Sequence, residues 1–174
     1  INNWEGTYFD FNNEKLFPMI DEAAKLGLDM FVLDDGWFGA RDFDDKGLGD
    51  WFVNEQKLAG GLDTIINRCK EKGLRFGLWF EPEMVNENSD LFRAHPEYAA
   101  IKPGEIPSRS RNQLILDFSK KEVVDYVYSL MSAILKKHEI SYIKWDMNRN
   151  FSEYFSQGLP ADRQGEYSHR YILG

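Results

Sequence analysis

The sequence predicts an α/β fold, namely about the first five βα units of a (β/α)₈ TIM barrel that this chain alone does not close. Three observations lead to this prediction. Strand-like and helix-like stretches alternate along the chain, acidic residues follow the strands, and the chain has only 174 residues. A barrel of this type takes at least ~200 residues, so about three of its strands have no counterpart in the sequence.

The first predicted unit occupies the N-terminal part of the chain. We expect a strand over 3–9, followed by a helix over 14–26. Asn13 has a side chain suited to cap the start of this helix, and Gly27 can adopt the left-handed conformation that commonly ends one.

Two further strands are predicted from short apolar runs. Residues 30–33 and 75–80 are expected to be buried strands, because strands covered on both faces are continuously apolar. An amphipathic helix is expected between them, over 62–72. The intervening loop is rich in Gly and Asp, and we expect its segment 41–50 to be a solvated lid.

The last two predicted strands flank a long helix. The fourth strand is expected over 114–117 and the fifth over 142–149. Ser119, with Glu122 three residues later, forms a capping-box pattern, so a helix is expected from there to about His138. An open sheet of five parallel strands has two unpaired edges, and we expect the chain to self-associate through them.

Composition excludes several classes of function. The chain has 21 basic and 29 acidic residues, a formal net charge of −8 and no basic stripe, which excludes nucleic acid and anionic membranes as partners. No apolar run approaches the ~20 residues that cross a bilayer. No signal peptide is visible, so we expect a cytoplasmic protein, although Ile1 is not a methionine and a leader is not assessable. Cys69 is the only cysteine, and we expect it to be a small buried apolar group.

Acidic residues follow the predicted strands directly. Parallel α/β folds place their active sites at the carboxyl ends of the strands, where such residues meet. Acid at four of the five predicted strand ends therefore indicates a common pocket. The residues concerned are Asp34, Asp35, Glu81, Glu83, Asp117 and Asp146.

The segment 142–149 carries the most informative pair. Successive side chains of a strand point to opposite faces, so Lys144 and Asp146 are expected on one face and Trp145 on the other. A nearby ammonium lowers the pKa of a carboxylate and keeps it ionised, as a carboxylate nucleophile requires. An ordinary ion pair at a strand end explains the same pattern, so this segment alone does not decide between the two.

These residue types fit a retaining glycosidase, which needs an ionised carboxylate to attack the anomeric carbon and a second, protonated carboxyl. Asp146 fits the first role, and Lys144 fits a donor to a sugar hydroxyl. The vicinal Asp34 and Asp35 can each accept a hydrogen bond from a different hydroxyl. The candidates for a flat apolar wall against a pyranose ring are Trp4, Trp37, Trp51 and Trp79.

Other interpretations of the same residues stay open. Asp34 and Asp35 could form a turn, or bind a divalent metal together with carboxylates of the loop 42–45, but the ligand spacing of an EF-hand is absent. The three histidines are scattered, which argues against zinc. Lys144 could form a Schiff base as in aldolases, although Asp146 two residues away favours its charged form. A non-catalytic sugar-binding domain would use the same carboxylates and tryptophans.

Six ordered blocks, which together extend over nearly the whole chain, resemble glycoside hydrolase family 36, the bacterial α-galactosidases or melibiases. The blocks are Asn3–Asp10, Phe31–Phe38, Leu48–Trp51, Gly77–Met84, Arg111–Asp117 and Lys144–Arg149. The resemblance implies a (β/α)₈ catalytic barrel, of which residues 1–174 would be the N-terminal part. It also implies hydrolysis with retention, without a metal or an organic cofactor.

The resemblance further implies roles for individual residues. Asp146 is expected to be the nucleophile that forms a β-galactosyl–enzyme, and Lys144 a donor to sugar hydroxyls. Asp34 and Asp35 are expected to bind the axial O4 and the O6 of galactose, which gives a basis for rejecting glucose. The remaining substrate-binding residues implied by the resemblance are Trp4, Trp79, Arg111 and Asn148.

The expected substrate is an α-galactoside oligosaccharide such as melibiose or raffinose, and the intact protein is expected to be a homo-oligomer. Within the family, α-N-acetylgalactosaminidases and galactosyl transferases of the raffinose-sugar type are the alternatives. The acid/base aspartate of the family follows a Gly-rich segment after the sixth strand, so we expect it beyond Gly174. We therefore expect the chain on its own to be nearly inactive.

Overall fold

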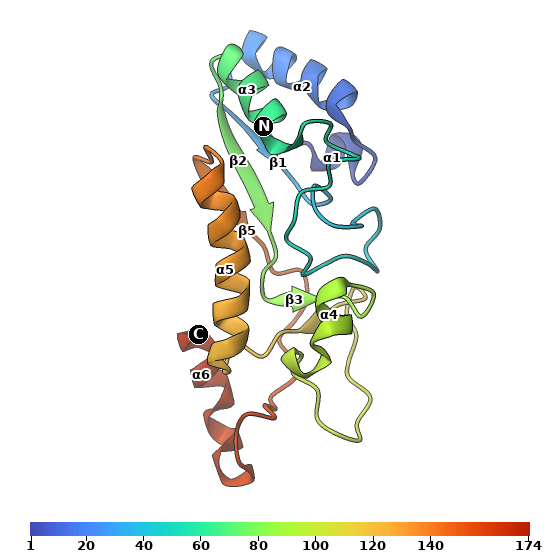
Figure 1. The fold of residues 1–174 in the computed structure, drawn as a ribbon, viewed down its shortest axis with the longest axis vertical. Coiled ribbons are helices and arrows are strands. Elements are labelled where there is room, and N and C mark those ends of the chain that lie inside the picture. The colour runs from blue at the N-terminus through green and yellow to red at the C-terminus, as the bar shows by residue number, and fades with distance from the viewer.

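A three-stranded parallel sheet lies at the centre of the computed structural model, which describes residues 1–174 (Figure 1). Its strands are β1 (Met30–Leu33), β2 (Arg75–Phe80) and β5 (Tyr142–Trp145), in the order β1-β2-β5. Parallel neighbours need long crossover connections, and helices provide them here. The α/β class and the positions of β1 and β2 are as the apolar runs predicted, whereas the fifth strand, predicted over 142–149, ends at Trp145.

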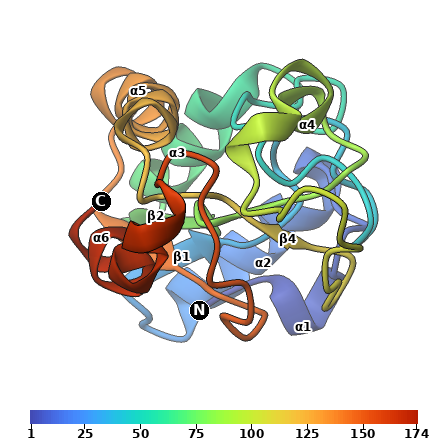
Figure 2. The same cartoon turned by 90° about the horizontal axis from the view of Figure 1, so that it is seen from below.

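Helices precede or connect the strands. The principal ones are α2 (Asn13–Lys25), α3 (Gly61–Glu71), which packs on α2 and β2, and α5 (Lys121–Lys137), which runs alongside the sheet in Figure 1. Figure 2 shows that two shorter helices, α4 and α6, lie on opposite sides of the molecule. The remaining elements are α1 (Trp4–Thr7), β3 (Met84–Val85), α4 (Asp90–Ala94), β4 (Leu114–Ile115), α6 (Tyr167–Leu173), and 3₁₀ helices at Pro96–Tyr98 and Ala161–Glu166.

The register of the sheet determines which side chains meet at its carboxyl end. Leu33 pairs with Leu78, which in turn pairs with Ile143. At the next position Trp79 pairs with Lys144, and one residue further along the first strand is Asp34. Because side chains at equivalent positions of parallel strands point to the same face, these three polar or aromatic side chains are brought together.

The predicted strand over 3–9 is wrong. Only Asn2 forms a parallel bridge, to Val32, and the chain then turns into the short helix α1. The Asn2 side-chain oxygen accepts the Trp4 N–H at 2.8 Å, and the Asn3 side-chain oxygen accepts the Asp34 N–H at 2.8 Å. These two contacts turn the backbone away from the sheet, which the local aromatic pattern does not reveal.

The predicted fourth parallel strand is also wrong. β4 covers only Leu114–Ile115 and pairs antiparallel with β3, in a separate two-stranded sheet. This small sheet lies beyond the arrowhead of β2 in Figure 1. An apolar pair of residues fits either sheet, because its pairing is decided by tertiary contacts and not by its own sequence.

Two helix starts differ from the predictions. The N-cap of α2 is Asn12 rather than Asn13, and its side chain accepts the Lys15 N–H at 3.1 Å. The capping box before α5 is absent, because the Ser119 hydroxyl donates to Asp117 Oδ1 at 2.5 Å instead of capping the helix. In both cases the side chain predicted to cap the helix has another partner: the Asn13 amide donates to the Ala59 carbonyl at 2.8 Å, and the Ser119 hydroxyl donates to Asp117.

Aromatic rings fill the core next to the carboxyl end of the sheet. Trp37 and Trp51 are 0% and 2% exposed, so the prediction that they form an exposed wall for a sugar ring is wrong. The solvated lid over 41–50 is wrong in part, because Arg41 and Leu48 are buried and only residues near the tip are exposed. Cys69 is buried as predicted, and burial raises its thiol pKa to about 12. None of the helices combines the length and apolar character needed to cross a membrane.

The corrected helix start leads to a stability prediction. Asn12→Ala should lower the free energy of unfolding by about 1 kcal/mol, because the Lys15 N–H loses its cap. Asn12→Asp should keep the stability, since an aspartate caps equally well. Urea titration of the variants measures the difference. A larger loss in Asn13→Ala than in Asn12→Ala would contradict the assignment.

Candidate active site

The carboxyl end of the sheet holds an ion pair between residues 110 positions apart. Lys144 Nζ donates to Asp34 Oδ2 at 2.8 Å, and the Asn2 side-chain amide donates to the same oxygen. Asp34 Oδ1 accepts the Asp35 N–H at 2.9 Å. The Asp34 side chain is 3% exposed and that of Lys144 36%, so the pair lies at the boundary between core and solvent.

Asp146 follows β5 directly, and its carboxylate accepts three hydrogen bonds. The Trp79 indole N–H and the Asn148 side-chain amide each donate to Oδ2 at 2.9 Å, and the Met147 N–H donates to Oδ1 at 3.0 Å. Burial on its own raises the pKa of Asp146, but these donors, with a smaller effect from the nearby Lys144 ammonium, hold the pKa below its usual value. The group is therefore ionised at neutral pH.

The alternation of strand faces accounts for this arrangement. Lys144 and Asp146 lie on one face with Trp79, whereas Trp145 points to the other face and donates to Glu83 Oε1 at 2.9 Å. The simple ion pair between Lys144 and Asp146 considered from the sequence is not formed. Lys144 binds Asp34 instead, and hydrogen bonds are the main cause of the lowered pKa of Asp146.

The two vicinal aspartates have different surroundings. Asp35 faces Arg41, whose Nε lies 3.0 Å from Oδ1 and whose second nitrogen lies 2.9 Å from Oδ2. Both side chains of this pair are almost fully buried, at 7% and 1% exposure. Burial raises the pKa of Asp35, and the forked guanidinium opposes that shift. Asp34 thus faces the site, whereas Asp35 joins the site to the loop that follows β1.

A buried network that sequence reasoning missed continues from Arg41. Its guanidinium donates to Asn86 Oδ1 at 2.9 Å, and the same oxygen accepts the Leu48 N–H at 3.0 Å. The Asn86 amide donates to the Asn112 carbonyl at 2.8 Å and to the Asp44 carbonyl at 3.1 Å. An apolar strand end followed by asparagine is the only signal in the sequence, and it does not identify partners 26 to 45 positions away.

Trp4 and Arg111 line a second part of the site. They border an open pocket of about 600 Å³ together with Tyr8, Phe9, Phe43, Asp44, Asp45 and Asn112. Arg111 and Asn112 both have left-handed backbone conformations, with φ of 53° and 58°. Asn2 connects this pocket to the ion pair, because its side chain contacts both the Trp4 N–H and Asp34.

The other strand-end acids have structural partners. Glu83 accepts the Tyr171 hydroxyl at 2.6 Å on the face opposite Asp146. Asp117 accepts the hydroxyls of Ser119 and Ser156 at 2.5 Å each. Glu81 is fully buried behind Asp146. The expected convergence of acids is thus found for four of the six residues, with Asp117 and Glu83 directed elsewhere.

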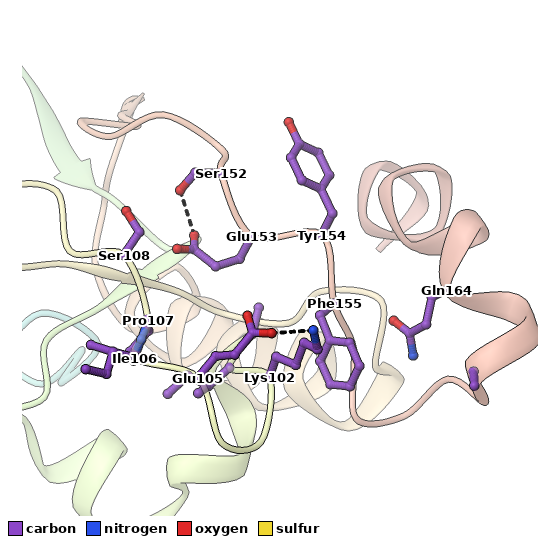
Figure 3. Close-up of a pocket in the computed structure, with 13 residues that line it drawn as sticks. Lys102, Glu105, Ile106, Pro107, Ser108, Ser152, Glu153, Tyr154, Phe155 and Gln164 are labelled. Carbon is purple, nitrogen blue, oxygen red and sulfur yellow. Dashed lines mark hydrogen bonds and ion pairs between the residues drawn. The ribbon is translucent and has the colours of Figure 1, made fainter.

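A further pocket, of about 590 Å³, lies between the loops 100–108 and 152–164 (Figure 3). Figure 3 shows Lys102 paired with Glu105, and Glu153 beside Ser152. None of the predicted substrate-binding residues lines this pocket. This pocket therefore lies apart from the strand-end carboxylates, whereas the pocket lined by Trp4 and Arg111 borders the site.

The family model described as Melibiase matches residues 1–174. The chain belongs to the melibiase family. It is 53% identical over 174 residues to α-galactosidase Mel36A of Lactobacillus acidophilus, a match that covers 100% of this chain and 24% of that relative. The family predicted from the sequence blocks is thereby confirmed, and the chain spans about a quarter of the length of the curated melibiases it matches.

Solved structures of melibiases superimpose closely on this chain. One is the family-36 α-galactosidase AgaA of Geobacillus stearothermophilus, a variant in complex with raffinose, at 51% identity and a TM-score of 0.96. A second AgaA variant, in complex with stachyose, gives 50% identity and a TM-score of 0.95. Each match covers 99% of this chain and 24% of the other. Almost the whole chain, including the carboxyl ends of its strands, therefore has the same fold as these melibiase structures.

The different surroundings of the two aspartates lead to a stability prediction. Asp35→Ala should lower the free energy of unfolding by about 3–5 kcal/mol, because it leaves the Arg41 guanidinium buried without a counter-charge. The matched variant Asp34→Ala should cost less, since the Lys144 ammonium is partly exposed and can be hydrated. Urea titration measures both. Equal losses would contradict the structural role of the Asp35–Arg41 pair.

Proposed function

We propose that this chain carries the nucleophile and the galactosyl subsite of a retaining α-galactosidase. The observation that supports this most directly is the Asp146 carboxylate, which is held ionised by three donors beside the Lys144–Asp34 pair. In the proposed reaction Asp146 attacks the anomeric carbon and forms a β-galactosyl–enzyme, which water then hydrolyses. The donors position the carboxylate and keep it unprotonated until the attack.

The ion pair next to Asp146 supports the choice of galactose. Asp34 can accept a hydrogen bond from the axial O4 through its remaining lone pairs, and Lys144 can donate to a neighbouring hydroxyl. We propose Asp35 as the partner of Asp34 that reaches O6, with Arg41 fixing its position. An equatorial O4, as in glucose, would not reach Asp34, and the loss of this additional hydrogen bond to a buried carboxylate disfavours glucose.

The walls of the proposed subsite come from neighbouring elements. Trp4 and Arg111 border the open pocket beside Asp34, and we propose that they contact the sugar chain. Trp79 is 1% exposed, so its proposed part is mainly the indole N–H on Asp146. The Asn148 amide is proposed to hold the nucleophile in the same way.

None of the carboxyl groups near Asp146 is suited to act as the general acid of the proposed reaction. Asp34 and Asp35 are paired with cations, and Glu81 is fully buried. We therefore propose that the acid/base group belongs to another part of the full-length protein. We propose that residues 1–174 are the first βα units of a (β/α)₈ catalytic barrel. In this barrel the segment at Asn2 and the strands β1, β2 and β5 would be neighbours in the wall.

The proposed substrates are raffinose-type α-galactosides, because related α-galactosidases were solved with raffinose and stachyose bound. The aldolase alternative is weakened by geometry. Lys144 Nζ forms an ion pair with Asp34 Oδ2 at 2.8 Å, whereas a Schiff-base lysine needs a free amine to attack a carbonyl carbon. No observation favours a purely sugar-binding role, which would leave the ionised Asp146 unexplained.

The role of Asp146 can be tested in the full-length protein. Asp146→Gly should lower kcat for an aryl α-galactoside by at least about 10³-fold, because the covalent step is lost. Added azide should restore part of the rate by attacking from the vacated side, with an inverted glycosyl azide as product. Rates are followed by release of the phenol. A small loss without rescue would place the nucleophile elsewhere.

The cause of the lowered pKa of Asp146 gives a pH prediction. Trp79→Phe removes the indole donor to Oδ2, so the pKa of Asp146 should rise towards its usual value. The nucleophile must be ionised, so activity is lost as the pH falls through this pKa. The acid limb of kcat/KM should therefore move to higher pH.

Trp145→Phe is the matched control for this experiment. It also removes one indole donor, but from Glu83 on the opposite face. Its acid limb should stay where it is in the unmodified protein. An acid limb that moves equally in both variants, or in neither, would contradict the assignment of Trp79.

A further inference from the structure

Glu81, the first residue after β2, is a buried carboxyl without a counter-ion. It is 0% exposed, and no lysine, arginine or histidine forms a salt bridge with it. Its Oε2 accepts the Gln113 side-chain amide at 3.0 Å, and its Oε1 accepts the Asn148 N–H. Burying a carboxyl away from any cation is costly, and burial raises its pKa. A role beyond packing would account for its presence.

The contacts of Glu81 lead to the nucleophile in two steps. Glu81 holds the backbone of Asn148, and the side-chain amide of Asn148 donates to Asp146 Oδ2 at 2.9 Å. Trp79, two residues before Glu81 on the same strand, donates to that same oxygen at 2.9 Å. Oδ1 accepts only the Met147 N–H and so keeps a lone pair available.

We propose that Glu81 is a positioning residue for Asp146, which acts by anchoring the Asn148 backbone so that its amide fixes the carboxylate. The fixed carboxylate then presents Oδ1 to the anomeric carbon. This inference rests on the proposed function, because it assigns Glu81 to the nucleophile of that reaction. Glu81 itself touches neither the substrate nor the reacting atoms.

The neighbouring Gln113 makes a conservative test possible. Its side-chain oxygen is buried and has no hydrogen-bond partner, while its amide nitrogen binds Glu81. In Glu81→Gln the new amide nitrogen would face the Gln113 amide nitrogen, so that two donors would meet. Rotation of the Gln113 amide by 180° would instead present its unpaired oxygen as an acceptor. The one side-chain oxygen of the Glu81→Gln variant would still accept the Asn148 N–H, so this variant should keep the anchor.

The first measurement compares variants of the full-length protein on an aryl α-galactoside. Glu81→Met keeps the approximate shape but removes both acceptors, and kcat should fall about 10²-fold, since misplacement of a reacting group by about 1 Å has this effect. KM should change less than about 3-fold, because the Asp34–Lys144 subsite is untouched. Glu81→Gln should retain kcat within about 5-fold. Unchanged kcat in Glu81→Met would overturn the proposal.

A double-mutant cycle distinguishes positioning from a general effect on folding. Asn148→Ala keeps the backbone N–H that Glu81 binds but lacks the amide that reaches Asp146. Glu81→Met added to Asn148→Ala should therefore lower kcat little further, because the connection is already broken. Losses that multiply would show that Glu81 acts independently of Asn148, and would overturn the proposal.

Two controls keep the result decisive. If Glu81→Met does not fold, Glu81→Asp takes its place, because it shortens the side chain and withdraws the acceptor from the Asn148 N–H. The same loss of kcat at constant KM is then expected, and full kcat would overturn the proposal. Asp146→Gly is measured in parallel: turnover that survives it refutes the proposed function and this inference together. An inactive Asp146→Gly with a fully active Glu81→Met refutes only the inference.

Discussion

The parallel pairing of β1, β2 and β5 positions the functional side chains. Each strand ends at the same edge, and the register that pairs Leu33 with Leu78 and Trp79 with Lys144 brings Asp34 into the same row. A shift of one residue in any strand would send its side chain to the opposite face. β1 and β2 are almost entirely buried, whereas β5 is partly exposed, with Tyr142 and Trp145 its most exposed side chains.

Separate partners at the strand ends offset the repulsion between the neighbouring acidic side chains. Asp34 and Asp35 each have a cation, but from different directions: Lys144 from across the sheet and Arg41 from the following loop. Asp146 relies mainly on neutral donors instead. A nucleophile held by neutral donors keeps its charge without a permanent ion pair, so the carboxylate remains available for reaction.

The sequence predicted what depends on short-range periodicity. Alternation along 142–149 placed Lys144 and Asp146 on one face, and the family blocks identified the melibiases. It failed where a distant partner decides the local structure. The helix α1 forms because Asn3 binds the Asp34 backbone, and the partner of Asp35 is an arginine inside a loop that periodicity cannot place. The buried carboxyl of Glu81 was visible as a motif, but its partners were not.

In the proposed reaction the ionised carboxylate after β5 becomes covalently bonded to the sugar. The most direct test of this step is to treat the full-length protein with a fluorinated α-galactosyl inactivator, digest it and map the labelled peptide by mass spectrometry. One galactosyl adduct is expected, on the side chain of Asp146. An adduct on another residue, or none despite measurable turnover, would contradict it.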